Sequence, residues 1–204
     1  MPRRDDLETI LVLGSGPIKI GQAAEFDFSG SQAVQALRED GYRVILVNSN
    51  PATIQNDPEM ADVVYIEPLL PDTIARIMEI ERPCALLAGM GGQTALNIAS
   101  ELSHNGTLER LNIELIGSDL EAIDKAEDRE LFNQVCESIQ LPISQAVACN
   151  TIDQVIAAAD LIGSWPILVR PAFTLGGLGG GTARDMGELV EISQLGLRNS
   201  RISQ

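Results

Sequence analysis

The sequence predicts an α/β protein with a parallel, doubly wound sheet, followed by the beginning of a second, smaller domain. Short apolar runs alternate with longer amphipathic segments over units of roughly 30 residues, a pattern typical of alternating strands and helices. Of the 204 residues, 45% are hydrophobic, which is enough to bury a core. These two observations exclude a disordered chain and favour one or two compact domains.

Five apolar runs are predicted as the strands of the first sheet: residues 9–13, 44–47, 63–66, 85–88 and 114–117. Amphipathic segments between and after them are predicted as helices at residues 31–39, 72–81 and 94–102. The lone histidine, His104, is predicted to end the last of these helices. With one histidine, no Ser–His–Asp or Cys–His arrangement can be built.

After Gly117 the pattern changes, and a second domain is predicted to begin near residues 118–130. Ser118 and Glu121 form a capping box that predicts one long helix to about residue 139, and Thr151 with Gln154 predicts another that ends at Gly163. A strand at 165–169, a glycine-dense loop at 176–181 and a helix near 187–195 complete the prediction. So few strands predict a small second core.

Charge and cysteine content exclude several classes of partner. The chain has 29 acidic and 14 basic residues and a formal charge of −15, so it would be repelled by nucleic acid and by anionic membranes. No apolar run approaches membrane-spanning length, and the start lacks the apolar region of a signal peptide. Three widely spaced cysteines predict neither a metal site nor a disulfide framework, so we expect a cytoplasmic protein.

A glycine turn at residues 14–21 follows the first predicted strand, where backbone N–H groups can bind an anion. A dinucleotide fingerprint would need glycine in place of Lys19, and the second strand would need to end in an acid rather than in Asn48. A nicotinamide-dependent oxidoreductase is therefore the weaker functional alternative. A tight turn with no ligand explains these residues as well as a phosphate site does.

Neutral polar side chains follow two further strands, at residues 48–53 and 90–94. Open α/β sheets bind ligands at this carboxyl edge, and amide and hydroxyl groups suit small polar ligands. Hydrogen bonding between the loops and helix capping explain the same residues, and the sequence favours that interpretation.

Arg170 follows the strand predicted at 165–169, which we expect to be buried, and precedes a run with five glycines in six residues, 176–181. Backbone N–H groups without side chains can approach phosphate oxygens, and an arginine beside them would add charge. A flexible hairpin with an arginine paired to a carboxylate is the alternative. Lys125 and Arg129 are four residues apart, so we expect them on one helix face, where neighbouring acids can neutralise them.

Several stretches, in order, resemble the first half of the carbamoyl-phosphate synthetase large subunit. In the first domain they are residues 13–18, 20–22, 25–30, 41–53, 57–62 and 90–97. Residues 125–129 and 170–181 continue the series in the second. The resemblance covers essentially the whole chain, and Ser29-Gly30 favours the first half of that subunit over its internal duplicate.

The resemblance implies a Rossmann-like pre-ATP-grasp domain at 1–127 and the amino-terminal part of an ATP-grasp domain at 128–204. It implies an ATP-dependent ligase whose MgATP phosphorylates bicarbonate, and whose partner, a glutaminase small subunit, supplies ammonia for arginine and pyrimidine synthesis. Transferred by position, Arg129, Arg170, Gly176 and Gly177 would bind ATP. The magnesium ligands would follow Gln204, so the isolated chain is expected to be inactive, and a non-catalytic remnant or partner-binding module is the main alternative.

Four departures from the family pattern limit the resemblance. Lys19 replaces an apolar residue, Ala88-Gly89 replaces Pro-Thr, and Leu178 interrupts the glycine loop. Ser164-Trp165 carries one extra residue before Arg170.

Overall fold

The computed structural model describes residues 3–16, 23–174 and 177–204. Its chain divides into two compact units, Met1–Ile123 and Asp124–Gln204. Lys19 lies outside the described residues.

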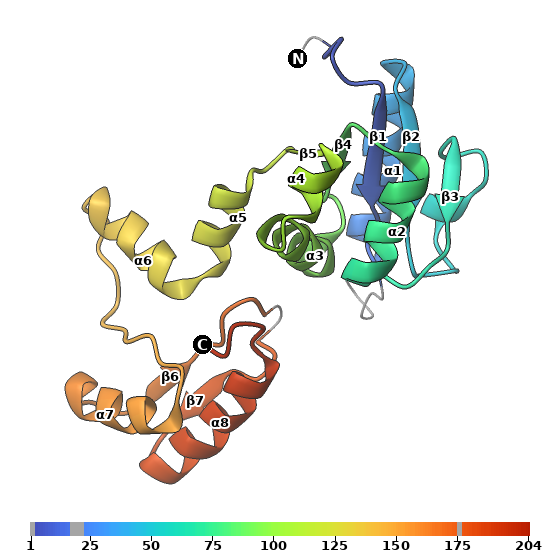
Figure 1. Ribbon diagram of the computed structural model, residues 1–204. Helices are drawn as coiled ribbons and strands as arrows, with labels where there is room; N and C mark the ends of the chain where they lie inside the picture. Colours follow the sequence, from blue (N-terminus) through green and yellow to red (C-terminus); the bar gives the residue numbers. More distant parts are fainter. Residues whose placement is uncertain (1–2, 17–22, 175–176) are drawn as a thin grey trace. The chain divides into compact units, whose positions relative to one another are not determined.

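The first unit is built on a five-stranded parallel sheet in the order β3-β2-β1-β4-β5 (Figure 1). Its strands are β1 (Thr9–Leu13), β2 (Arg43–Val47), β3 (Val63–Tyr65), β4 (Ala85–Leu87) and β5 (Glu114–Ile116). Each lies within one residue of its predicted bounds. The order reverses direction on either side of β1, so the predicted doubly wound α/β fold is confirmed.

Among the described residues of this unit, five helical segments lie between the strands: α1 (Ala23–Glu39), η1 (Ile54–Asn56), α2 (Pro71–Glu81), α3 (Gly92–His104) and α4 (Thr107–Leu111). His104 ends α3, as predicted. The prediction placed the start of α1 at residue 31, eight residues too late. It also missed η1 and α4.

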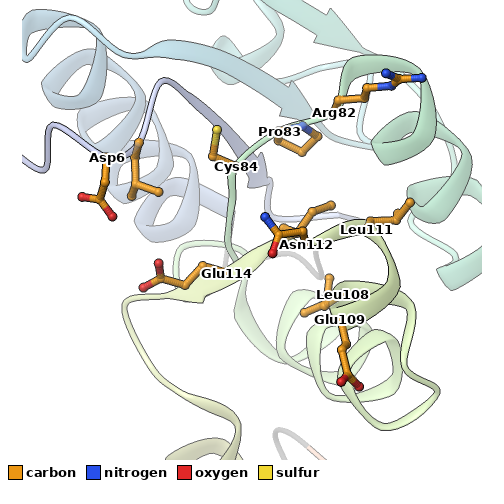
Figure 2. A pocket seen from close by; sticks show the side chains of 11 residues that line it. Asp6, Arg82, Pro83, Cys84, Leu108, Glu109, Leu111, Asn112 and Glu114 are labelled. Carbon is orange, nitrogen blue, oxygen red and sulfur yellow. The ribbon is translucent and has the colours of Figure 1, made fainter.

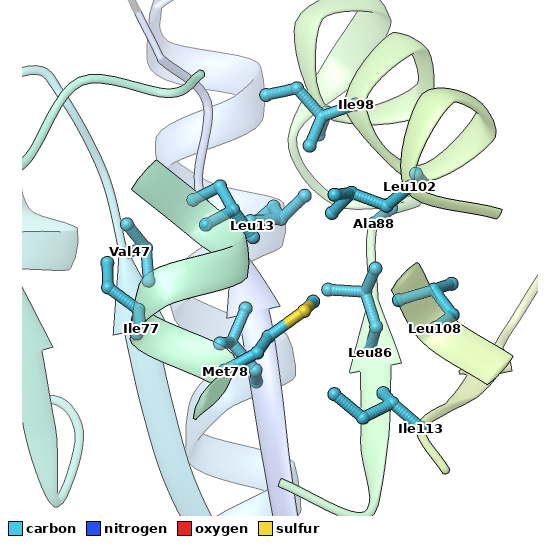
Figure 3. Close-up of a cluster of buried hydrophobic side chains, with 14 of the residues drawn as sticks. Leu13, Val47, Ile77, Met78, Leu86, Ala88, Ile98, Leu102, Leu108 and Ile113 are labelled. Carbon is cyan, nitrogen blue, oxygen red and sulfur yellow. The ribbon is translucent and has the colours of Figure 1, made fainter. Parts of the chain in front are cut away.

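Strand side chains alternate between two cores, one on each face of the sheet. Leu11 and Leu13 belong to the larger core, whereas Ile10 and Val12 belong to the smaller one. The larger core is covered by α2, α3 and α4, and Figure 3 shows Met78 of α2 and Leu102 of α3 packed over it. The smaller core is covered by α1. Burial on both faces explains why the strands are continuous apolar runs.

The second unit contains the antiparallel pair β6 (Ile167–Val169) and β7 (Gly181–Ala183), with α6 (Arg129–Ser138), α7 (Ile152–Ile162) and α8 (Met186–Asn199). Helices α7 and α8 contribute to the small core beside the strand pair (Figure 1). Four buried residues form it: Ala159, Ile167, Ala183 and Leu189. The prediction of a small second core is confirmed.

The predicted long helix from residue 120 to about 139 is wrong, because the structure has two helices there. Helix α5 (Leu120–Glu127) ends before Asp128, and α6 begins after it. Asp128 has an extended backbone, and its side chain accepts hydrogen bonds from the N–H groups of Glu130 and Leu131. That is N-cap geometry, which starts a new helix. Lys125 and Arg129 therefore do not share a helix face.

The second capping box is confirmed, with one difference. Thr151 Oγ1 accepts from the N–H of Gln154, and the Gln154 side chain accepts from the N–H of Asn150 rather than of Thr151. Helix α7 ends, as predicted, at Gly163, which has a left-handed φ of 64°. No helix among the described residues is both long and apolar enough to cross a bilayer.

Candidate functional site

Asn48 lies at the carboxyl edge of the first sheet and bonds the loops that follow β1 and β2. It is fully buried, and its Oδ1 accepts hydrogen bonds from the N–H of Gly16 (3.0 Å) and of Asn50 (3.2 Å). A Cβ on Gly14 would lie 2.8 Å from both Cβ and Cγ of Asn48, so the turn requires glycine there. The Gly16 bond removes one of the donors that an anion-binding turn would offer. This bond favours the tight-turn interpretation at Gly16, and residues 17–21 of the predicted turn lie outside the described residues.

A second set of hydrogen bonds ties α1 to the loop that follows β2. Asp27 accepts from the hydroxyl of Thr53 (2.7 Å) and from that of Ser15 (3.4 Å). Gln55 is fully buried and donates to the carbonyl of Phe26 (2.8 Å). Sequence reasoning assigned no role to Asp27 or Gln55, because neither lies in a periodic apolar pattern.

The loop after β4 joins the same edge through direct backbone contact. A Cβ on Gly91 would lie 2.4 Å from the carbonyl oxygen of Gly14 and 2.7 Å from that of Leu13. Gly92 has a φ of +65°, and a Cβ on it would lie 3.0 Å from the ring of Phe26.

In the loop after β2, Asn48 and Asn50 accept from backbone N–H groups, and the Thr53 hydroxyl donates to Asp27. The Ser49 hydroxyl is buried with no described partner. The loop-bonding and capping interpretation is confirmed for Asn48, Asn50 and Thr53, the last of which caps η1.

Arg129 is the first residue of α6, next to the capping Asp128. Its Nε is buried and has no hydrogen-bond partner among the described residues. A buried donor without an acceptor is unfavourable, so it marks a place where an anion would be stabilised. The structure therefore leaves Arg129 available for the role that its position predicts.

Arg170 directly follows β6 and begins the connection to β7. Its side chain is exposed, and within the described ranges it makes no hydrogen bond or ion pair. The preceding strand is not buried on both faces as predicted: Ile167 packs in the core, but Leu168 is 63% exposed. The reason is that α7 and α8 pack against only one face of the strand pair.

The glycines that follow Arg170 do not all have the same role. A Cβ on Gly179 would lie 3.1 Å from the Asn199 side chain, and one on Gly180 would lie 2.8 Å from the Val169 carbonyl oxygen. Both positions therefore need glycine for packing. Gly177 has a φ of +74° and no described atom within 4 Å of an added Cβ, so packing does not explain this glycine, and its carbonyl accepts from the Gly180 N–H. Gly176 lies outside the described residues.

The structure thus brings Arg170 and Gly177 onto one loop, whereas Arg129 begins a separate element of the same unit. Positive charge and open backbone N–H groups are what phosphate oxygens require. Among the described residues, no group of three or more histidine, cysteine or acidic side chains could hold a metal ion. The cysteines Cys84, Cys136 and Cys149 are free thiols.

A hollow of about 530 Å³ opens at the other edge of the first sheet, where the strands begin (Figure 2). Apolar side chains such as Leu7 and Leu108 line it, and Asp6, Glu109 and Glu114 lie around it. Ligands of open α/β sheets bind at the opposite, carboxyl edge. Arg4 already bonds both Asp6 and Glu114 and holds the pKa of each carboxyl below its usual range. The hollow is therefore not a candidate active site.

Among the described residues Glu81, the last residue of α2, is a third acid with a shifted pKa. Arg43 donates to its Oε2 (2.6 Å), and the hydroxyl of Tyr65 donates to its Oε1 (2.7 Å). The hydrogen bond from Arg43 is the main cause of a lowered pKa at the Glu81 carboxyl, and the bond from Tyr65 adds to it. The group fastens α2 to β2 and β3, so its role is structural.

Two family models together match almost the whole chain. The one described as "Carbamoyl phosphate synthase preATP-grasp domain" matches residues 6–125. The one described as "Carbamoyl-phosphate synthase L chain, ATP binding domain" matches residues 128–204. Arg129, Arg170 and the glycine loop all lie within the second match.

Curated relatives are similar along the full length of this chain. The carbamoyl phosphate synthase large chain of Nostoc sp. is 55% identical over 204 residues, and that of Archaeoglobus fulgidus is 56% identical over 204 residues. The alignments cover 100% of this chain but only 18% and 19% of those proteins. The chain thus spans about a fifth of the length of the curated relatives it matches.

Solved structures share the fold at low sequence identity. The biotin carboxylase domain of Hydrogenobacter thermophilus 2-oxoglutarate carboxylase has a TM-score of 0.66 and 17% identity, over 94% of this chain and 41% of that one. Campylobacter jejuni biotin carboxylase has a TM-score of 0.61 and 18% identity, over 95% and 42%. These likenesses concern the fold alone. With the family matches, they confirm the predicted pre-ATP-grasp domain followed by the start of an ATP-grasp domain.

Proposed function

Since this chain belongs to the carbamoyl phosphate synthase large-chain family, we propose that it serves ATP-dependent activation of bicarbonate in such an enzyme. In this step a bicarbonate oxygen attacks the γ-phosphorus of ATP, ADP leaves, and carboxyphosphate forms. Ammonia then attacks the carbon of carboxyphosphate and displaces phosphate, which gives carbamate. Residues 1–127 would supply the pre-ATP-grasp domain and residues 128–204 the beginning of the ATP-binding domain.

The observation that carries this proposal is a pair of arginines with unused donors as far as the described residues show. The Arg129 Nε is buried and has no partner in the part of the chain that the structure describes, and no described acid pairs with Arg170. Phosphoryl transfer needs fixed positive charge near the phosphate oxygens, and both arginines lie at positions that the family resemblance assigns to ATP. Gly177, with open space where a side chain would lie, would bind phosphate through its N–H, and Gly176 would do so beside it.

Magnesium would accompany ATP and neutralise charge on its β- and γ-phosphates. We propose that its acidic ligands come from polypeptide that follows in the longer relatives. The Hydrogenobacter domain was crystallised with MgADP and bicarbonate, so a similar fold holds both kinds of ligand. We further propose a glutaminase small subunit as the source of ammonia, a cytoplasmic location, and a role in arginine and pyrimidine synthesis.

The test is the bicarbonate-dependent ATPase of the intact large chain, with and without substitution of the two arginines. Arg129→Gln and Arg170→Gln should each lower kcat/KM for ATP by about 10- to 100-fold, the size of one lost charged hydrogen bond. Arg184→Gln is the matched control, because Arg184 is 79% exposed and pairs only loosely with Glu188, at 3.8 Å. Full activity in both arginine variants would contradict the assignment.

The same assay separates the alternatives. If the intact wild-type protein shows no ATP hydrolysis that depends on bicarbonate and magnesium, the chain is a non-catalytic remnant or partner-binding module, which pull-down by the glutaminase subunit would then reveal. Saturable quenching of NADH fluorescence would revive the nicotinamide alternative. We expect no such binding, since the Gly16 N–H is already bonded to Asn48.

A further inference from the structure

The turn after Arg170 contains a backbone conformation that an aromatic residue rarely adopts. Phe173 has a φ of +54°, in the left-handed region, although it is neither glycine nor asparagine. It is also buried, with 7% of its surface exposed. Such a conformation persists only where the surroundings hold it in place, and such positions cluster near ligand sites.

The segment that follows α8 supplies those surroundings. The guanidinium carbon of Arg201 lies 5.2 Å from the centroid of the Phe173 ring, which is cation–π distance. One residue earlier, the Ala172 N–H donates to the carbonyl of Gln204 (3.0 Å). Within the turn, the Thr174 hydroxyl donates to the Pro171 carbonyl (3.1 Å). The turn is thus fastened to residues 200–204 by one ring contact and one backbone hydrogen bond.

Helix α8 also packs against both ends of the same connection. A Cβ on Gly196 of α8 would lie 3.1 Å from the Gly179 carbonyl oxygen and 3.1 Å from Pro171 Cγ. Helix α8 therefore packs against the connection at both Pro171 and Gly179. Arg170 lies immediately before the part that is held, and its own side chain is exposed. Because Arg170 is joined directly to Pro171, the position of its backbone depends on how this turn is held.

We propose that Phe173 and Arg201 are positioning residues: their ring–guanidinium contact fixes the turn and so directs Arg170 toward the nucleotide phosphates. The inference rests on the proposed function, because it assigns the turn a task in ATP binding. It adds two residues that act through Arg170 and touch no substrate themselves. A role in folding alone would change protein stability without changing the affinity for ATP.

The test uses the intact large chain and the KM for ATP in the bicarbonate-dependent ATPase. Arg201→Gln should raise that KM about two- to fivefold, the size of an exposed cation–π contact, with kcat changed less than about twofold. Arg201→Lys should restore the KM, because an ammonium group also binds the ring face. Phe173→Gly keeps the left-handed backbone accessible but removes the ring, and should raise the KM at least as much as Arg201→Gln. Arg198→Gln, an exposed arginine on α8 with no described partner, is the matched control and should change nothing.

Hydrogen exchange of the Ala172 N–H gives a second readout that does not depend on activity. Arg201→Gln should speed its exchange about two- to fivefold, and Arg201→Lys should not. An unchanged KM in both Arg201→Gln and Phe173→Gly, or a KM that lysine fails to restore, overturns the inference. Unchanged exchange in Arg201→Gln overturns it even if no variant hydrolyses ATP. Absence of bicarbonate-dependent ATPase in the wild type contradicts the proposed function instead.

Discussion

Gly91 lies where the loop after β4 passes directly against the end of β1, and replacing it by alanine tests how closely these loops pack. The added Cβ would lie 2.4 Å from the Gly14 carbonyl oxygen, 2.5 Å from Ala95 Cβ and 2.7 Å from the Leu13 carbonyl oxygen. Ordinary contact begins near 3.4 Å, so the nearest oxygen would have to retreat by about 1 Å. Gly91 has a φ of −104°, which alanine adopts freely, so the effect is steric alone.

The size of the stability loss in Gly91→Ala depends on which atoms the added Cβ displaces. Two of the three atoms are backbone oxygens of a central strand and its turn, and these cannot rotate away as a side chain could. Overpacking costs about 1–3 kcal/mol in general, and we place Gly91→Ala at about 3 kcal/mol for this reason. For a unit of this size, that loss lowers the melting temperature by about 9–15 °C. It is a large share of the stability of a typical domain.

The assay is urea unfolding of the 204-residue chain, followed by far-UV circular dichroism. Gly89→Ala is the matched control, since Gly89 is exposed, lies two positions earlier in the same loop and has no atom within 4 Å of an added Cβ. It should leave the free energy of unfolding within about 0.5 kcal/mol of wild type. Equal unfolding midpoints for Gly91→Ala and Gly89→Ala would refute the packing described for this edge.

Three further predictions concern stability. Glu81→Gln should lower the free energy of unfolding by about 1–2 kcal/mol at pH 7, because Arg43 loses a charged partner. The folded pKa of Glu81 lies below its ordinary value of 4.5, so its contribution is present above that pH and lost as pH falls through the folded pKa. A difference that persists in full at pH 2 would contradict this. Asn48→Ala leaves the buried Gly16 N–H without its acceptor and should lower the free energy of unfolding, measured by urea titration, by about 2–3 kcal/mol. A decrease of less than about 0.5 kcal/mol would contradict a structural role for this hydrogen bond. Asp128→Ala removes a helix cap and should cost about 1 kcal/mol in thermal unfolding, whereas no change would favour one continuous helix.

The strands could be predicted from the sequence because helices or other segments cover both faces of the sheet. Leu11 and Val12 point to opposite cores and are both fully buried, so the strand has no polar face to confuse with a helix. The early part of α1 could not be predicted, since it contains Asp27 and Gly30, which are poor helix formers. Tertiary contacts hold it instead: Asp27 bonds Thr53, and a Cβ on Gly30 would lie 2.7 Å from the Gln55 side chain.

The candidate site could be predicted only in part, for a related reason. The pattern identified Arg170 and a glycine-dense loop, but it could not separate Gly177, which is open, from Gly179, which packs on α8. That difference depends on a helix much later in the chain. The sequence pattern also could not predict that Asp128 would interrupt the helix before Arg129. Aspartate occurs inside helices as well, when its side chain does not cap the backbone. The Phe173–Arg201 contact left no local signal at all.

The most direct test of the central claim follows an oxygen atom from bicarbonate. The intact large chain is incubated with ATP, magnesium and ¹⁸O-labelled bicarbonate, and the released inorganic phosphate is analysed by mass spectrometry. If bicarbonate attacks the γ-phosphorus, the bridging oxygen of carboxyphosphate stays with phosphate when the C–O bond breaks, so about one labelled oxygen should appear in each phosphate. Phosphate that carries no ¹⁸O would mean that water attacks ATP directly, and would contradict bicarbonate activation by this protein.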